Sequence, residues 1–206
     1  LLSKKGHLIV DDTIGTALLF AYQFEERPDD YAIVGNNLYS AQKIYEFLLN
    51  FIPEDQVVFF PADELLRAES LSSSRELMAQ RLYAMGQLTS PKHKILVTHP
   101  AGLLRFLPNP EEFKKNIINL KISCKTDLNN LKNHLTELGY NRVNKIDQSL
   151  EFASRGDILD IFSVNYLNPI RIEFFDDEIE SIHTFDIATQ SSLDAIDEIT
   201  IFPAND

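Results

Sequence analysis

The chain is poor in cysteine and in long apolar runs. Its 206 residues contain one cysteine, Cys124, which excludes an intramolecular disulfide framework and a multi-cysteine zinc site. No run approaches the roughly 18 consecutive apolar residues of a membrane span, and no basic-then-apolar signal opens the chain. These absences predict a cytoplasmic protein in a reducing compartment, with no membrane partner.

Positive charge is scarce towards the C-terminus. The formal net charge is −12, and no Lys or Arg follows Arg171, whereas ten carboxylates do. Such a surface repels phosphate backbones, so the chain alone is expected to bind nucleic acid poorly. Seven Lys and Arg residues lie within 114–145, but Asp127, Glu137 and apolar positions interrupt them. We interpret this segment as a solvated amphipathic helix rather than a DNA-binding patch.

The first half of the chain alternates strand-like and helix-like segments joined by short links. This order predicts a parallel sheet with helices on its faces, in an α/β domain over residues 1–108. The segments are the strands His7–Val10, Tyr31–Gly35, Val57–Phe60 and Lys94–Thr98, and the helices Thr16–Phe24, Asn37–Phe51 and the one that follows Ser72–Ser74.

The pattern changes after Pro108, and we place a domain boundary there. A helix is expected over Asp127–Leu138, with Gly139 as its C-terminal stop. Strand-like runs then follow, which predicts a smaller α+β domain over residues 109–192. They are Arg142–Lys145, Phe152, Ile158–Phe162, Ile170–Phe175 and Ile179–Phe185. Residues 193–206 contain one more strand, Thr200–Ala204, which we expect to begin a return to the first sheet. Because the chain starts without Met and stops directly after this strand, we expect a fragment of a longer protein.

The segment after the first strand is a degenerate phosphate loop. Aligned with G-x-x-x-x-G-K-[ST], it has Val10 and Gly15 at the glycines, Thr16 at the lysine and Ala17 at the hydroxyl position. The two aspartates that follow Val10 add negative charge where phosphate would lie. We therefore predict that this loop binds no nucleotide and that the chain needs no cofactor.

The remaining polar clusters give no catalytic site. Asp176-Asp177-Glu178 is expected to be a solvated turn rather than a metal site, because consecutive residues point in different directions. The five histidines fall in separate elements without a metal-binding spacing. Cys124 has no paired histidine, and Ser72–Ser74 is better explained as a helix cap. We predict no enzyme activity and no metal.

The most informative stretch covers two strands rich in carboxylates. It runs from Glu151 to Phe162 and continues from Pro169 to Ile179. Alternation aims Ile170, Ile172 and Phe174 to one side and Arg171, Glu173 and Phe175 to the other. We also expect Ile158 and Ile161 to lie among apolar partners. An exposed aromatic beside an arginine indicates a protein-recognition patch.

Motifs in both halves resemble one family. The second half has E-F-x-x-R-G-D-I-L-D-I-F followed by P-I-R-I-E-F-F-D-D-E-I-E-S-I-x-T-F-D-x-x-T-Q. The first half has N-N-L-Y-S-A-Q, F-P-A-D-E, A-Q-R and P-A-G-L-L. Essentially the whole chain thus resembles the N-terminal region of the bacterial transcription-repair coupling factors (Mfd), and more distantly UvrB.

The resemblance implies a fold, a partner and contact residues. Residues 1–108 would be part of a RecA-like domain with a void phosphate loop, and 109–192 an inserted domain that recruits UvrA to RNA polymerase stalled at DNA damage. Arg155, Arg171 and Phe175 match the family positions that contact UvrA. The parent would be an ATP-dependent DNA translocase, whose ATP, magnesium, polymerase and double-stranded DNA sites lie outside this chain.

Other interpretations stay open at this point. Arg155 and Arg171 could simply pair with Asp157, Glu173 or nearby carboxylates. The chain could instead come from a UvrB-like protein that binds ATP and DNA, or be a structural module. The same face could also contact the parent's C-terminal region in the resting protein. Two departures from the family pattern stand out: Asp147–Leu150 lacks the usual glycine, and Ser191 replaces an arginine.

Overall fold

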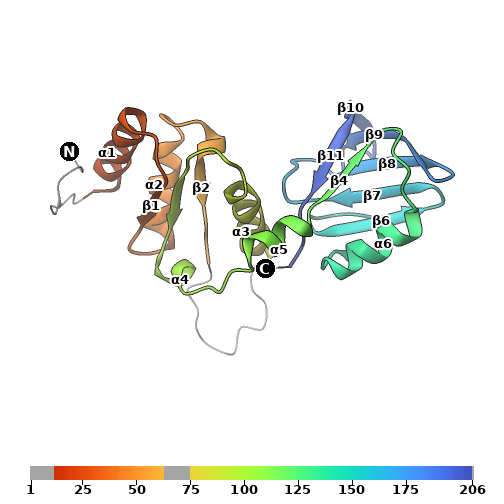
Figure 1. The fold of residues 1–206 in the computed structure, drawn as a ribbon, viewed down its shortest axis with the longest axis horizontal. Helices are drawn as coiled ribbons and strands as arrows, with labels where there is room; N and C mark the ends of the chain where they lie inside the picture. The colour runs from red at the N-terminus through yellow and green to blue at the C-terminus, as the bar shows by residue number, and fades with distance from the viewer. Residues whose placement is uncertain (1–11, 63–74, 206) are drawn as a thin grey trace. The chain divides into compact units, whose positions relative to one another are not determined.

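The computed structural model describes residues 12–62 and 75–205. By its internal contacts the chain divides into two compact units, residues 1–107 and 108–206 (Figure 1). The expected strand His7–Val10 and the expected cap Ser72–Ser74 lie outside the described residues.

The first unit is a parallel sheet covered by helices. Its strands are in the order β1-β3-β2, and both pairings are parallel, as the alternation of segments predicts. Helices α1 and α2 lie on one face of this sheet and α3 on the other (Figure 1). The elements are α1 (Thr13–Glu26), β1 (Tyr31–Val34), α2 (Leu38–Leu48), a 3-10 turn (Glu54–Gln56), β2 (Val57–Phe59), α3 (Arg75–Leu88), β3 (Ile95–Thr98) and α4 (Pro100–Leu103).

Local chemistry explains why α2 begins and how it packs. Asn37 and Ser40 form a reciprocal capping box at its N-terminus, which satisfies backbone donors that the helix leaves unpaired. Helical spacing then buries Ala41, Ile44 and Leu48 against the core of the unit.

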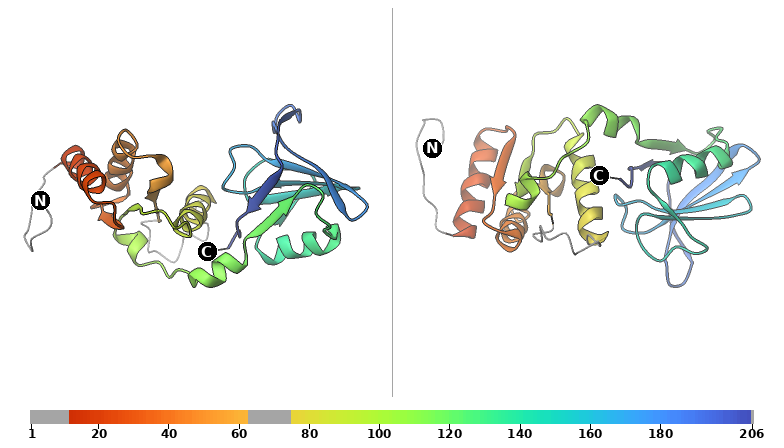
Figure 2. Two further views of the ribbon diagram at one scale, coloured as in Figure 1. Left: turned by 45° about the horizontal axis from the view of Figure 1, so that its top comes forward. Right: turned by 90° about the horizontal axis from the view of Figure 1, so that it is seen from below.

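The second unit is mainly antiparallel. A six-stranded sheet has the order β10-β9-β8-β7-β6-β5, in which only the β5–β6 pair is parallel, and β11 pairs with β4 (Figure 2). The elements are α5 (Pro110–Lys115), β4 (Ile118–Lys121), α6 (Leu128–Glu137), β5 (Asn141–Arg142), β6 (Glu151–Arg155), β7 (Ile158–Phe162), β8 (Ile170–Phe175), β9 (Glu178–Phe185), β10 (Ser192–Ala195) and β11 (Glu198–Ile201).

Residues 114–145 do not form one amphipathic helix. They contain the end of α5, the strand β4, the helix α6 and the short strand β5. The helical prediction fails at β4, because its residues gain their hydrogen-bond partners from β11, far along the chain. Local periodicity carries no information about that pairing.

The C-terminal strand does not join the first sheet. β11 pairs antiparallel with β4, so it lies within the second unit. Two further bonds hold the residues beyond it: the Tyr140 hydroxyl donates to the Phe202 carbonyl at 2.7 Å, and the Ala204 N–H donates to the Leu138 carbonyl at 2.8 Å. The prediction that Thr200–Ala204 returns to the first sheet is therefore wrong.

The described residues thus form a mixed α/β protein with one parallel and two largely antiparallel sheets. Among them, no helix is long and apolar enough to cross a membrane.

Candidate protein-binding face

The six-stranded sheet has two unlike faces. Along β8 the burial alternates as expected: Ile170, Ile172 and Phe174 are buried, whereas Arg171 and Glu173 are half-buried and Phe175 is exposed. Leu131 and Leu135 of α6 are buried as well, and α6 runs beside the sheet near β6 (Figure 1). An antiparallel sheet packed on one face commonly leaves the other to solvent.

Strand register identifies what shares the second face. Arg155 lies opposite Ile158, which lies opposite Glu173; in the next row Asp160 lies opposite Arg171 and Arg171 opposite His183. Ile158 therefore lies on this side, away from the buried Ile161, so only one of the two isoleucines joins the core. We call this surface the open face. It comprises Arg155, Ile158, Asp160, Arg171, Glu173, Phe175, Ser181 and His183.

Arg171 is held by several partners at once. Its Nε and Nη2 donate to the two carboxylate oxygens of Asp160 at 2.6 and 2.8 Å, and Nη2 also donates to Gln190 Oε1 at 3.3 Å. Its guanidinium carbon lies 4.5 Å from the centre of the Phe185 ring. The hydrogen bond to Asp160 raises the pKa of Arg171 above its ordinary value, so this side chain stays charged.

Arg155 is placed differently. Its side chain is exposed, and its Nη2 donates to the backbone carbonyl of Asn144 at 2.9 Å. Glu173, across one strand, accepts from the Ser181 hydroxyl at 2.7 Å. Within the described part of the chain, neither arginine forms an ion pair with Asp157 or Glu173. Arg171 pairs with Asp160 instead, and Arg155 bonds to a neutral carbonyl.

Phe175 stands at the end of β8 and is 75% exposed. The turn after it contains Asp176, whose φ of 58° is left-handed, and Asp177, which binds Lys125 with an Nζ–Oδ2 distance of 3.1 Å. This solvated turn agrees with the sequence expectation. A large aromatic held out by a tight hairpin is a candidate anchor for a pocket on a partner.

The degenerate phosphate loop falls at the start of α1. Val10 lies outside the described residues, and Gly15, Thr16 and Ala17 lie in the first turns of the helix. The carboxylate of Asp12 caps this helix and accepts from the Gly15 N–H, and Thr16 Oγ1 donates to the Asp12 carbonyl at 2.9 Å. Ala17 is buried in the core.

The other polar residues do not converge. Within residues 12–62 and 75–205, no group of three His, Cys, Asp or Glu side chains could hold a metal ion. Cys124 is exposed, and His99 is buried, where its Nε2 accepts from the Ala62 N–H at 3.0 Å.

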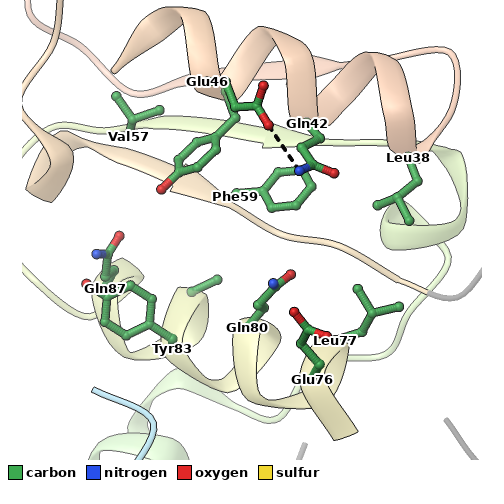
Figure 3. A pocket seen from close by; sticks show the side chains of 12 residues that line it. Leu38, Gln42, Glu46, Val57, Phe59, Glu76, Leu77, Gln80, Tyr83 and Gln87 are labelled. Atoms are coloured by element: carbon green, nitrogen blue, oxygen red, sulfur yellow. Dashed lines mark hydrogen bonds between the residues drawn. The ribbon is translucent and has the colours of Figure 1, made fainter. Parts of the chain in front are cut away.

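A groove of about 370 Å³ lies between α2 and α3, along the edge strand β2. Figure 3 shows Val57 and Phe59 on the strand between the two helices, with Gln42 of α2 donating to Glu46 at 3.1 Å. Gln80 and Tyr83 face it from α3 (Figure 3). Amide, carboxylate and phenol groups beside apolar side chains can bind, but they supply no nucleophile with a paired base.

The residues that hold Arg171 were not predicted from the sequence. Asp160, Phe185 and Gln190 come from β7, β9 and the turn before β10. Period-two alternation could place Asp160 and Arg171 on open faces of their own strands. Their contact additionally requires the register of the β7–β8 pair, which no local pattern fixes.

The second unit matches a known domain family. Residues 118–206, which make up most of the second unit, match the model of the UvrB interaction domain.

Over most of its length the chain is also similar to transcription-repair-coupling factors. It is 34% identical to that of Bacillus subtilis (strain 168) over 174 residues, which cover 84% of the chain and 15% of the relative. It is 32% identical to that of Staphylococcus aureus (strain bovine RF122 / ET3-1) over 188 residues, or 91% of the chain and 16% of the relative. The resemblance inferred from the motifs is confirmed, and the chain spans about a sixth or less of the length of these relatives.

Proposed function

We propose that the chain is an adaptor region that captures UvrA and so links stalled RNA polymerase to nucleotide excision repair. The observation that carries this proposal is the open face, on which the exposed Phe175 shares one side of a sheet with Arg155 and Arg171. Aromatic residues and arginines are both enriched in protein–protein interfaces. The similarity to transcription-repair-coupling factors supports the choice of partner.

The two arginines would have different roles in this contact. Arg155 is exposed and bonded to a neutral carbonyl, so its full charge is available to a carboxylate of the partner. Arg171 already pairs with Asp160, so it contributes through the part of its guanidinium that Asp160 leaves open.

We infer a non-catalytic role for the first unit. It would be part of a RecA-like domain whose phosphate loop has lost its function, over residues 1–108. Asp12 supports this, because its carboxylate occupies the start of α1, where a phosphate would need the backbone N–H groups. The parent protein would be an ATP-driven translocase in the cytoplasm, with its ATP, magnesium, polymerase and DNA contacts in other domains.

The proposal is tested by calorimetry with purified UvrA. We expect the chain to bind, and Arg155→Ala to weaken the complex by about 1–2 kcal/mol, because it removes the cation that would pair with a carboxylate of the partner. Lys43→Ala, which removes an exposed cation of α2 paired with Glu46, serves as the control and should bind like the wild type. If the wild-type chain shows no heat of binding at micromolar UvrA, the adaptor role is wrong.

A second experiment addresses the UvrB-like alternative, which requires nucleotide binding. We expect millimolar ATP with magnesium to leave the thermal unfolding of the chain unchanged, because the lysine and hydroxyl positions hold Thr16 and Ala17. A ligand present at about 100 times its Kd would add roughly 2.7 kcal/mol to the free energy of unfolding. A reproducible rise in melting temperature that requires magnesium would contradict the degenerate-loop interpretation.

The open face could also be covered within the parent. We propose, as the resemblance implies, that the parent's C-terminal region contacts it in the resting protein and that activation exposes it.

A further inference from the structure

The guanidinium of Arg171 has five N–H donors, and the structure accounts for three. Nε donates to one oxygen of Asp160, and Nη2 donates to the other and to Gln190. Nη1 donates to no acceptor among the described residues. The side edge of the guanidinium, which would take a partner's carboxylate in a bidentate manner, is therefore already filled.

Arg171 is also fixed in position before any partner arrives. Its side chain is 19% exposed and that of Asp160 16%, and the guanidinium stacks on the buried ring of Phe185. Asp160 lies directly opposite Arg171 in the β7–β8 register. The rotamer freedom that an arginine normally loses on binding has thus been lost during folding.

The turn that carries Gln190 is ordered by its own bonds. Asp186 Oδ1 accepts from the Thr189 N–H at 2.7 Å and from the Thr189 hydroxyl at 2.8 Å, and these bonds lower the pKa of Asp186. Gln190 Nε2 donates to the Ile187 carbonyl at 2.7 Å, which aims Oε1 at Arg171. Gln190 Oε1, which accepts from Nη2 of Arg171, is therefore also held in place before a partner binds.

We propose that Asp160 is a positioning residue that leaves the two N–H groups of Nη1 as the donors of Arg171 for the partner, and that they bind a neutral carbonyl oxygen. The inference rests on the proposed UvrA binding and deepens it. Asp160 already offsets the charge of the Arg171 guanidinium, and the nearby Glu173 adds negative charge, so a second carboxylate would gain much less at Nη1 than at an unpaired arginine. A backbone or amide carbonyl needs no such charge attraction and costs less to desolvate.

A double-mutant cycle on the whole chain tests the positioning. We expect Asp160→Ala to weaken UvrA binding about tenfold in the wild-type background, but less than twofold in the Arg171→Ala background, because Asp160 acts only through Arg171. Asp160→Asn, which keeps the shape, should fall between. Glu46→Gln, which removes another ion-paired carboxylate, is the matched control and should leave affinity unchanged. Tighter binding by Asp160→Ala, or additive losses in the double variant, would overturn the proposal.

Two readouts separate positioning from simple loss of structure. In the wild type, the Arg171 Nε–H should give a resolved NMR signal that Asp160→Ala broadens and Asp160→Asn retains.

The second readout is the salt dependence of the affinity for UvrA. Raising the salt concentration should weaken the wild-type and Arg171→Ala complexes by the same factor, whereas the affinity of Arg155→Ala should depend less on salt. If Arg171→Ala reduces this salt dependence as Arg155→Ala does, the partner group is a charged carboxylate and the proposal is wrong. If the wild type does not bind UvrA, the proposed function fails and the inference with it.

Discussion

Replacement of Phe175 by alanine is expected to weaken UvrA binding by about 2 kcal/mol or more, roughly 30-fold in affinity. The ring is 75% exposed at the end of β8, so its apolar area remains in contact with water until a partner covers it. Alanine removes that area without leaving a cavity in the free chain. Calorimetric titration of UvrA with the variant measures the loss.

The chain offers a matched control for this experiment. Phe51, in the first unit, is 55% exposed, so Phe51→Ala removes the same type of side chain from a different surface. This variant should bind UvrA with the wild-type affinity. Equal losses for Phe51→Ala and Phe175→Ala would show that the open face has no special role.

Replacement of Phe152 by alanine is expected to have the largest effect on stability, about 3–5 kcal/mol. Phe152 lies on β6 with 0% of its surface exposed, opposite Ile161 on the buried face of the sheet. Removing the ring loses the free energy that its burial contributes. It also leaves a cavity, because the neighbouring strands cannot close around the space. Denaturant unfolding followed by circular dichroism measures the change, with Phe175→Ala expected within about 0.5 kcal/mol of the wild type. A loss below about 1 kcal/mol for Phe152→Ala would contradict its place in the core.

The regular parts of this fold could be predicted from the sequence because their signals are local. Alternation along Ile170–Phe175 identified both faces of β8, and the helix expected over Asp127–Leu138, with Gly139 as its stop, corresponds to α6. Strands β4 and β10 were not predicted. β4 is only four residues long and pairs with β11, near the other end of the second unit, so its conformation depends on a contact that no local window contains.

The sequence indicated residues for the candidate site, but not the interactions that hold them. The motif and the alternation led to Arg155, Arg171 and Phe175, and the structure places all three on the open face. Two possibilities stayed open for the arginines at the level of sequence, capture of a partner or pairing within the chain. Arg171 pairs within the chain, with Asp160, and that pairing depends on cross-strand register rather than on composition. Its role in binding UvrA stays a prediction.

The same geometry explains why an internal ion pair is compatible with a recognition role. A guanidinium stacked on Phe185 and held by Asp160 keeps its charge and its orientation, whereas a free arginine on a strand would lose about 2 kcal/mol of rotamer freedom on docking. In the proposed contact, the two N–H groups of Nη1 remain for the partner, while the other three N–H groups of Arg171 are already bonded.

Hydrogen–deuterium exchange of the chain with and without UvrA tests whether the open face is the surface that binds UvrA. We expect slower exchange in β8, β9 and the turn between them when UvrA is bound, with α1, α2 and α3 unchanged, and loss of that protection in Phe175→Ala. Protection confined to the helices of the first unit, or protection of β8 and β9 that persists in Phe175→Ala, would contradict it.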